Sequence, residues 1–181
     1  MRVRAGDQSL QSHLENSAAN TQYVSPAVQN SLLDAARQLI KESIIKDVSS
    51  ARIWAIMADE TADRNKQELM VIVLRYVLVD DTGRCRIHES PILLLDVLKE
   101  IERMLTEKFG STDVELRSTG VNVGQVLLKK INELGLDKNA LVGQGYDGAA
   151  YMSSEAVGAA AEVRKEAPLA VYFHRLLWIY E

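Results

Sequence analysis

The sequence holds a single cysteine, Cys85, among its 181 residues. One cysteine cannot form an intramolecular disulfide, and together with only three histidines it excludes the paired Cys and His ligands of a zinc finger. No apolar stretch approaches the roughly 20 residues that a helix needs to cross a bilayer, and no apolar run near the N-terminus marks a secretory signal. We therefore expect a soluble, intracellular protein with no membrane partner.

An excess of basic residues is also missing. Lys and Arg total 21 while Asp and Glu total 25, so the formal net charge is −4. A free-standing DNA-binding module is usually basic, so we expect no DNA-recognition module here. The hydrophobic share of 47% and the length of 181 residues suit one domain with a real core.

Hydrophobic periodicity predicts the elements of the first half. Residues 1–22 are polar and are expected to form a flexible tail, followed by a partial domain over 23–181. Ser25 and Pro26 are suited to start a helix, and apolar residues recur at helical spacing over 28–48. This amphipathic helix would need a partner surface. Short apolar runs then predict three strands joined as an antiparallel meander, over 53–58, 69–77 and 85–97.

The second half alternates helices and strands. Gly135 is placed to end one helix, and Pro168 to stop another. Helices are expected over 99–109, 121–134 and 149–166, with strands over 140–143 and 169–174. The predicted class is α/β, with a mixed sheet (a three-stranded antiparallel meander plus further strands) and flanking helices. That is the RNase H-like order, although the pattern alone does not separate it from other α/β layouts.

Two aspartates stand at predicted strand ends. Asp59 ends the first strand, and Asp147 follows the fourth in a glycine-rich segment. Sites tend to form at the ends of strands in open α/β sheets, and two carboxylates can hold Mg²⁺, which prefers oxygen ligands. Asp at a strand-to-helix turn is also an ordinary helix cap, so spacing alone leaves both interpretations open. Gly143, Gly145 and Gly148 lack phosphate-loop spacing and are expected to permit a tight turn beside Asp147.

Both aspartates lie in segments that resemble a known family. Residues 54–63 (Trp-Ala-Ile-Met-Ala-Asp-Glu-Thr-Ala-Asp) are similar to the first-aspartate strand of hAT-superfamily DNA transposases. Residues 143–153 (Gly-Gln-Gly-Tyr-Asp-Gly-Ala-Ala-Tyr-Met-Ser) resemble the second-aspartate segment of the subgroup related to zinc-finger MYM-type proteins and a THAP-type repressor of a kinase inhibitor. The resemblance implies an RNase H-like catalytic domain, nuclear and transposon-derived. Asp59 and Asp147 would be the first two acids of a DDE motif, as catalytic residues and ligands of Mg²⁺ or Mn²⁺.

The sequence departs from the family pattern in ways that argue against activity. The family's third acid, a glutamate, lies beyond a large helical insertion, and this chain is expected to stop before it. Glu155, Glu162 and Glu166 do not match that role. Tyr151 stands where Asn is usual, Arg175 replaces a Cys after His174, and residues 99–117 look like extra material. We expect a partial copy that is inactive alone.

Three hypotheses follow. In the first, the chain is an incomplete transposase catalytic domain, whose intact relatives cleave DNA and transfer strands with divalent metal. In the second, it is a domesticated nuclear scaffold without catalysis, which binds a protein partner or a second copy. In the third, the motifs match by accident in an unrelated α/β binding domain, and the strands carrying Asp59 and Asp147 are then not neighbours.

Overall fold

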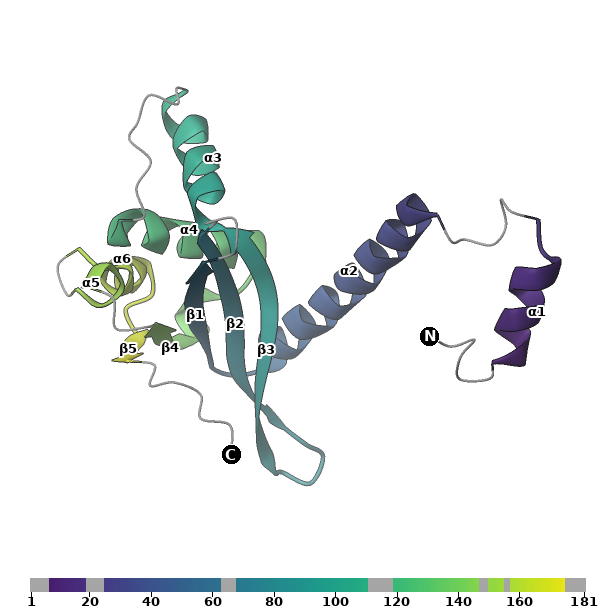
Figure 1. The fold of residues 1–181 in the computed structure, drawn as a ribbon. Coiled ribbons are helices and arrows are strands. Elements are labelled where there is room, and N and C mark those ends of the chain that lie inside the picture. Colours follow the sequence, from purple (N-terminus) through teal and green to yellow (C-terminus); the bar gives the residue numbers. More distant parts are fainter. Residues whose placement is uncertain are drawn as a thin grey trace. The chain divides into compact units, whose positions relative to one another are not determined.

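The computed structural model describes residues 7–18, 25–62, 68–110, 119–146, 150–154 and 157–174 (Figure 1). It divides into two compact units, Met1–Glu42 and Ser43–Glu181. The predicted end of a tail after residue 22 lies outside the described residues and stays a prediction. No helix of the described part of the chain is long and apolar enough to span a membrane.

The first unit is helical. Helix α1 (Gln8–Asn16) lies in the stretch for which the sequence predicts no element. The Asp7 side chain caps it by accepting a hydrogen bond from the Leu10 amide at 3.0 Å. None of its residues is buried, and Leu10 and Leu14, one turn apart, are its only large apolar residues. Helix α2 (Pro26–Ser50) begins at the predicted proline, and its residues Ile44, Ile45 and Val48, within the second unit, pack on the core.

A five-stranded mixed sheet organises the second unit, with strand order β3-β2-β1-β4-β5. The predicted antiparallel meander is confirmed, since β2 pairs antiparallel with both β1 and β3. The remaining two strands run parallel to β1 and to each other. The strands are β1 (Trp54–Ala62), β2 (Glu68–Val79), β3 (Cys85–Asp96), β4 (Leu141–Tyr146) and β5 (Val171–His174). This is the fold class predicted from the sequence.

Helices pack against one face of this sheet. Side chains alternate between the two faces of a strand, so every second residue of β1 and β2 points into the helical layer. The helices are α3 (Val97–Phe109), α4 (Gly120–Glu133), the short η3 (Lys138–Ala140), α5 (Ala150–Ser153) and α6 (Ala159–Glu166). The buried core includes Trp54, Ile56, Ala58, Met70, Ile72, Leu74 and Tyr76 from the sheet, and Val97, Ile101, Val123, Leu127, Ile131, Ala160 and Val163 from the helices.

Ion pairs join α3 to α4 at the surface of the helical layer. Lys130 is buried, and its Nζ atom lies 2.7 Å from Glu100 and 3.0 Å from Glu133. Lys129 donates a hydrogen bond to Glu107, which holds the pKa of that carboxyl below its usual value. Helix α3 therefore packs as part of the domain. Against the family pattern, residues 99–117 look like extra material.

The single helix predicted over 149–166 is wrong, because α5 and α6 are separate helices. Gly158 has an extended conformation, with φ −79° and ψ 162°, and forms the N-cap of α6. The start of α4 fills the break between them. A Cβ at Gly120 would lie 2.1 Å from the Tyr151 carbonyl oxygen and 2.4 Å from that of Val157. Tertiary packing therefore sets this break.

Candidate functional site: the carboxyl ends of β1 and β4

Asp59 lies near the carboxyl end of β1, paired with Val71 of β2. Its side chain is half-buried. By alternation it shares a face with Ala55 and Met57, whereas Ala58 and Glu60 point toward the helical layer. The first predicted site residue therefore stands on the sheet face opposite the helical core.

Strands β1 and β4 are parallel neighbours. Their register pairs Ile56 with Gln144 and Met57 with Gly145, so both strands run toward the same edge of the sheet. Asp147, which follows β4 in the sequence, lies outside the described residues. The third hypothesis, an unrelated α/β binding domain, predicts that these two strands are not neighbours. That prediction is wrong.

Gln144 ties β4 to two other elements. Its side chain is completely buried. The Nε2 atom donates to the carbonyl oxygen of Ala160 in α6 at 3.0 Å and to that of Ala170, just before β5, at 2.9 Å. The Oε1 atom accepts a hydrogen bond of 3.0 Å from the hydroxyl of Tyr146. The sequence alone does not predict this network, although the alternation of side chains along a strand places Gln144 and Tyr146 on the same face.

Gly143 and Gly145 lie within β4, so the prediction that they form a tight turn is wrong for these two. They make room for the ring of Phe173 on β5. A Cβ at Gly145 would lie 2.4 Å from Phe173 Cε2, and one at Gly143 would lie 3.2 Å from Cε1. The third glycine of the segment, Gly148, lies outside the described residues.

Tyr151 connects α5 to β1. Its hydroxyl donates a 2.5 Å hydrogen bond to Oε2 of Glu60, the residue after Asp59. The residue that departs from the family pattern therefore contacts the strand that carries the first aspartate. Nothing in the sequence signals this contact, because 91 positions separate the two residues.

Two of the glutamates after Asp147, Glu162 and Glu166, have structural partners, whereas Glu155 lies outside the described residues. Glu162 accepts hydrogen bonds from Lys165 and from Gln125, and these bonds lower the pKa of its carboxyl. Glu166 pairs with Lys138. Within the described ranges, no three His, Cys, Asp or Glu side chains gather as a metal site. Glu162 and Glu166 thus take part in contacts between the helices and η3, away from Asp59.

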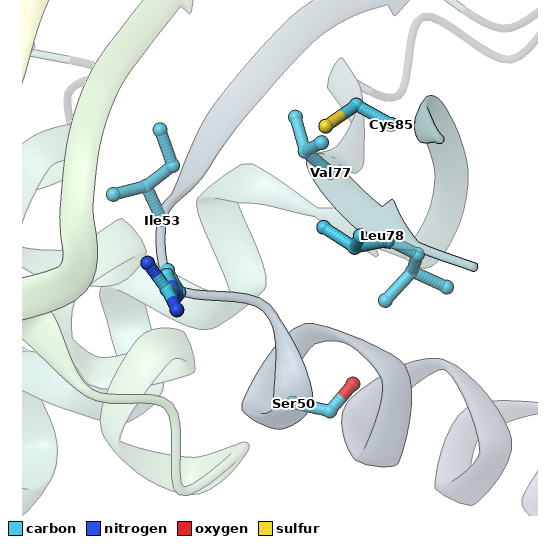
Figure 2. Close-up of a pocket in the computed structure, with 7 residues that line it drawn as sticks. Ser50, Ile53, Val77, Leu78 and Cys85 are labelled. Carbon is cyan, nitrogen blue, oxygen red and sulfur yellow. The ribbon is translucent and has the colours of Figure 1, made fainter. Parts of the chain in front are cut away.

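A cavity of about 760 Å³ opens at the other end of the sheet. Figure 2 shows its lining: Ser50 ends α2, Ile53 precedes β1, Val77 and Leu78 belong to β2, and Cys85 starts β3. Its walls are mostly apolar, and none of the described residues that line it is a carboxylate. The cavity therefore lacks the carboxylate ligands that a hard cation prefers, and it is separate from the carboxyl ends of β1 and β4.

Comparison with known proteins agrees with this fold. The chain is similar to the family described as the ZMYM1/FAM200, RNase-like domain. The match covers residues 4–88, which include Asp59. Over 171 residues the chain is 25% identical to the mouse 52 kDa repressor of the inhibitor of the protein kinase, covering 94% of this chain and 20% of the relative. The human protein of the same name is 25% identical over 114 residues, covering 60% of this chain and 15% of the relative.

The chain thus spans a fifth or less of the length of these relatives. No solved structure matches it. Together, the family match and the relatives support the resemblance to transposase-derived, hAT-like proteins at the level of an RNase-like domain.

Proposed function

We propose that this chain is the RNase-like part of a transposase-derived protein of the hAT superfamily, and that Asp59 and Asp147 form a divalent-cation site. The parallel pairing of β1 with β4 carries the proposal. Met57 and Gly145, the last paired residues of the two strands, each precede an aspartate by two residues. If this register continues, both carboxylates emerge at the same edge of the sheet and on the same face.

The chemistry of these residues suits Mg²⁺ or Mn²⁺. Both ligands would be carboxylates, which are hard oxygen donors, and a half-buried Asp59 leaves room for the waters that Mg²⁺ retains. Such an ion, when bound, can activate a water or a 3′-hydroxyl and stabilise the leaving oxygen at a phosphodiester. Asp59 would supply its oxygen from a rigid strand, and Asp147 from the segment after β4.

We propose no DNA cleavage by this chain alone. The family's third acid is not matched in this sequence, and Glu162 and Glu166 are engaged in other contacts. DNA would be the substrate of intact relatives, in the nucleus, with a glutamate from a further segment completing the site.

Titration with Mn²⁺, followed by the loss of the free-ion electron paramagnetic resonance signal, tests the cation site. We expect one ion per wild-type chain, and affinity at least about tenfold weaker in Asp59→Asn and in Asp147→Asn, since losing even an outer partner of a metal ligand costs 10–100-fold. Asp81→Asn is the matched control, because this exposed aspartate lies in the β2–β3 turn at the opposite end of β2. Equal affinity in all four proteins would refute the site.

A domesticated scaffold is the second candidate. It is favoured by large apolar side chains that are exposed on α2, with Leu32, Leu33, Leu39 and Ile40 each at least 60% exposed. The scaffold would bind a protein partner or a second copy without needing the acids. A wild-type chain that binds no Mn²⁺, yet self-associates in sedimentation analysis and loses this on Leu33→Asp, would favour the scaffold.

A further inference from the structure

The cavity at the amino end of β1 lies between two walls of the same unit (Figure 2). One wall is the connection from α2 to β1, with Ser50 and Ile53, and the other is the end of the β2–β3 hairpin, with Val77, Leu78 and Cys85. Its volume of about 760 Å³ falls within the range of small-molecule sites, roughly 300–1,000 Å³. The cavity is therefore large enough to hold a ligand.

The first wall is anchored on both sides. Val48, in the last turns of α2, is buried in the core. Trp54, the first residue of β1, is also buried, and its Nε1 atom donates a 3.0 Å hydrogen bond to the carbonyl oxygen of Asp137. The connection over 51–53 is therefore held from both ends.

The second wall is closed by a tight turn. The Oδ1 atom of Asp80 accepts hydrogen bonds from the amides of Thr82, at 2.9 Å, and Arg84, at 3.0 Å. The Asp80 amide in turn donates to the Arg84 carbonyl oxygen at 3.0 Å. Val79 and Cys85, which pair across the hairpin next to this turn, are thereby fixed. Both walls are formed before any ligand arrives.

The apolar lining extends beyond the first cavity. A smaller hollow of about 150 Å³ shares Ile53 and Val77 with it, and further lining residues are Tyr76, Ile87 and Val142. Ile53 is 48% exposed and Ile87 is 62% exposed, so this surface is in contact with water. An apolar chain that lies along both hollows would remove it from water, which favours binding.

Arg52 is the one charged residue among the described residues that line the larger cavity. It is exposed, and none of the acids that the structure describes forms an ion pair with it. Asp80, the acid next to Val79, is engaged by the turn and lies 3.8 Å from Nη2 of Arg86. The cavity therefore combines apolar walls with a positive charge that has no described counter-ion.

We propose that this cavity binds an amphipathic anion, a carboxylate on an apolar chain, with the carboxylate on Arg52 and the chain on Ile53 and Val77. Arginine suits this ligand, because its planar guanidinium can donate two parallel hydrogen bonds to one carboxylate. An uncharged chain of the same length would leave Arg52 without a counter-ion. The site lies at the opposite end of β1 from Asp59, and it does not depend on the proposed cation site.

Cys85 reports whether the cavity is occupied, because it is the only cysteine of the chain and lines the wall. The full chain is alkylated with N-ethylmaleimide, an uncharged reagent, at increasing concentrations of decanoate below the onset of micelles. We expect bound decanoate to slow alkylation to a plateau. Octanoate should need about 4–16-fold higher concentrations, since each buried methylene contributes about fourfold in affinity. Thr106→Cys in a Cys85→Ser chain is the control, on the exposed side of α3.

Substitutions of Arg52 test the choice of an anion. Arg52→Ala should weaken decanoate by about two- to fivefold, since ion pairs at exposed sites are modest, and should leave the affinity for decanol unchanged. Arg52→Lys keeps the charge and should restore most of the affinity. Arg84→Ala is the matched control, because this arginine is exposed in the neighbouring turn and does not line the cavity. It should bind decanoate as the wild type does.

Three results would overturn the proposal. The first is an alkylation rate of Cys85 that decanoate leaves unchanged. The second is equal slowing in the Thr106→Cys control, which would show a detergent-like effect on the whole chain. The third is decanol that protects Cys85 as well as decanoate does, with Arg52→Ala without effect, because the cavity would then select no charge.

Discussion

Replacing Gly145 by alanine should destabilise the protein through one identifiable contact. The new methyl group would lie 2.4 Å from Cε2 and 2.8 Å from Cζ of Phe173, well inside the 3.5–4.0 Å of ordinary carbon contacts. The ring must therefore move by about 1 Å or more. Such overpacking lowers the free energy of unfolding by about 1–3 kcal/mol. Alanine also restricts the unfolded chain, which raises the free energy of unfolding by about 0.4–1 kcal/mol. We expect a net loss of about 1–2 kcal/mol.

A double-mutant cycle isolates this contact. Urea unfolding of wild type, Gly145→Ala, Phe173→Ala and the double variant gives the interaction energy between the two positions. Without the Phe173 ring, alanine at position 145 should cost less than about 0.5 kcal/mol, since the clash is gone. Gly143→Ala is the control, because its nearest contacts are 3.1 Å and 3.2 Å and require smaller shifts. An equal cost of Gly145→Ala in both backgrounds would refute the packing argument.

Two further substitutions test the fold directly. Gly120→Ala should lower the free energy of unfolding by more than Gly145→Ala does, by at least about 3 kcal/mol. The new Cβ would meet the backbone oxygens of Tyr151 and Val157, which cannot rotate away. A melting temperature near that of wild type would contradict this prediction. Glu162→Gln should change the acid side of the stability profile, because the hydrogen bond from Lys165 lowers the folded-state pKa of Glu162 below its usual 4.5. The stabilisation by ionised Glu162 is present at neutral pH and is lost as pH falls from about 4.5 through the lowered pKa. The difference in the free energy of urea unfolding between wild type and variant should therefore become smaller from about pH 7 to about pH 3. A difference that stays constant over this range would contradict the prediction.

The sheet was predictable where local pattern and tertiary packing agree. The meander follows from short apolar runs ending in turn formers, and α4 follows from its periodicity and from Gly135, which ends it with φ +67°. Helix α1 is not predicted from the sequence, because Leu10 and Leu14 are its only large apolar residues and none of its residues is buried. The division between α5 and α6 was missed because the packing of Gly120 against distant backbone atoms sets it.

The candidate site was predictable only in part. The placement of Asp59 near a strand end follows from the apolar run before it, and the resemblance singles out Asp147. The spacing of the sequence does not predict the contacts that Gln144, Gly145 and Tyr146 make. These contacts depend on Ala170, which comes 26 residues after Gln144, and on Phe173, which lies beside Gly145 because β5 pairs with β4. The glycines therefore suggested a turn, whereas they make room for an aromatic ring.

A crystal structure of the chain grown with Mn²⁺ tests the central claim most directly, because the ion is located by its anomalous scattering. We expect one ion within coordination distance of a carboxylate oxygen of Asp59 and of one of Asp147, with water completing the octahedron. The account would be contradicted by carboxylates that point to opposite faces of the sheet, or by an ion that binds elsewhere and leaves both aspartates unliganded.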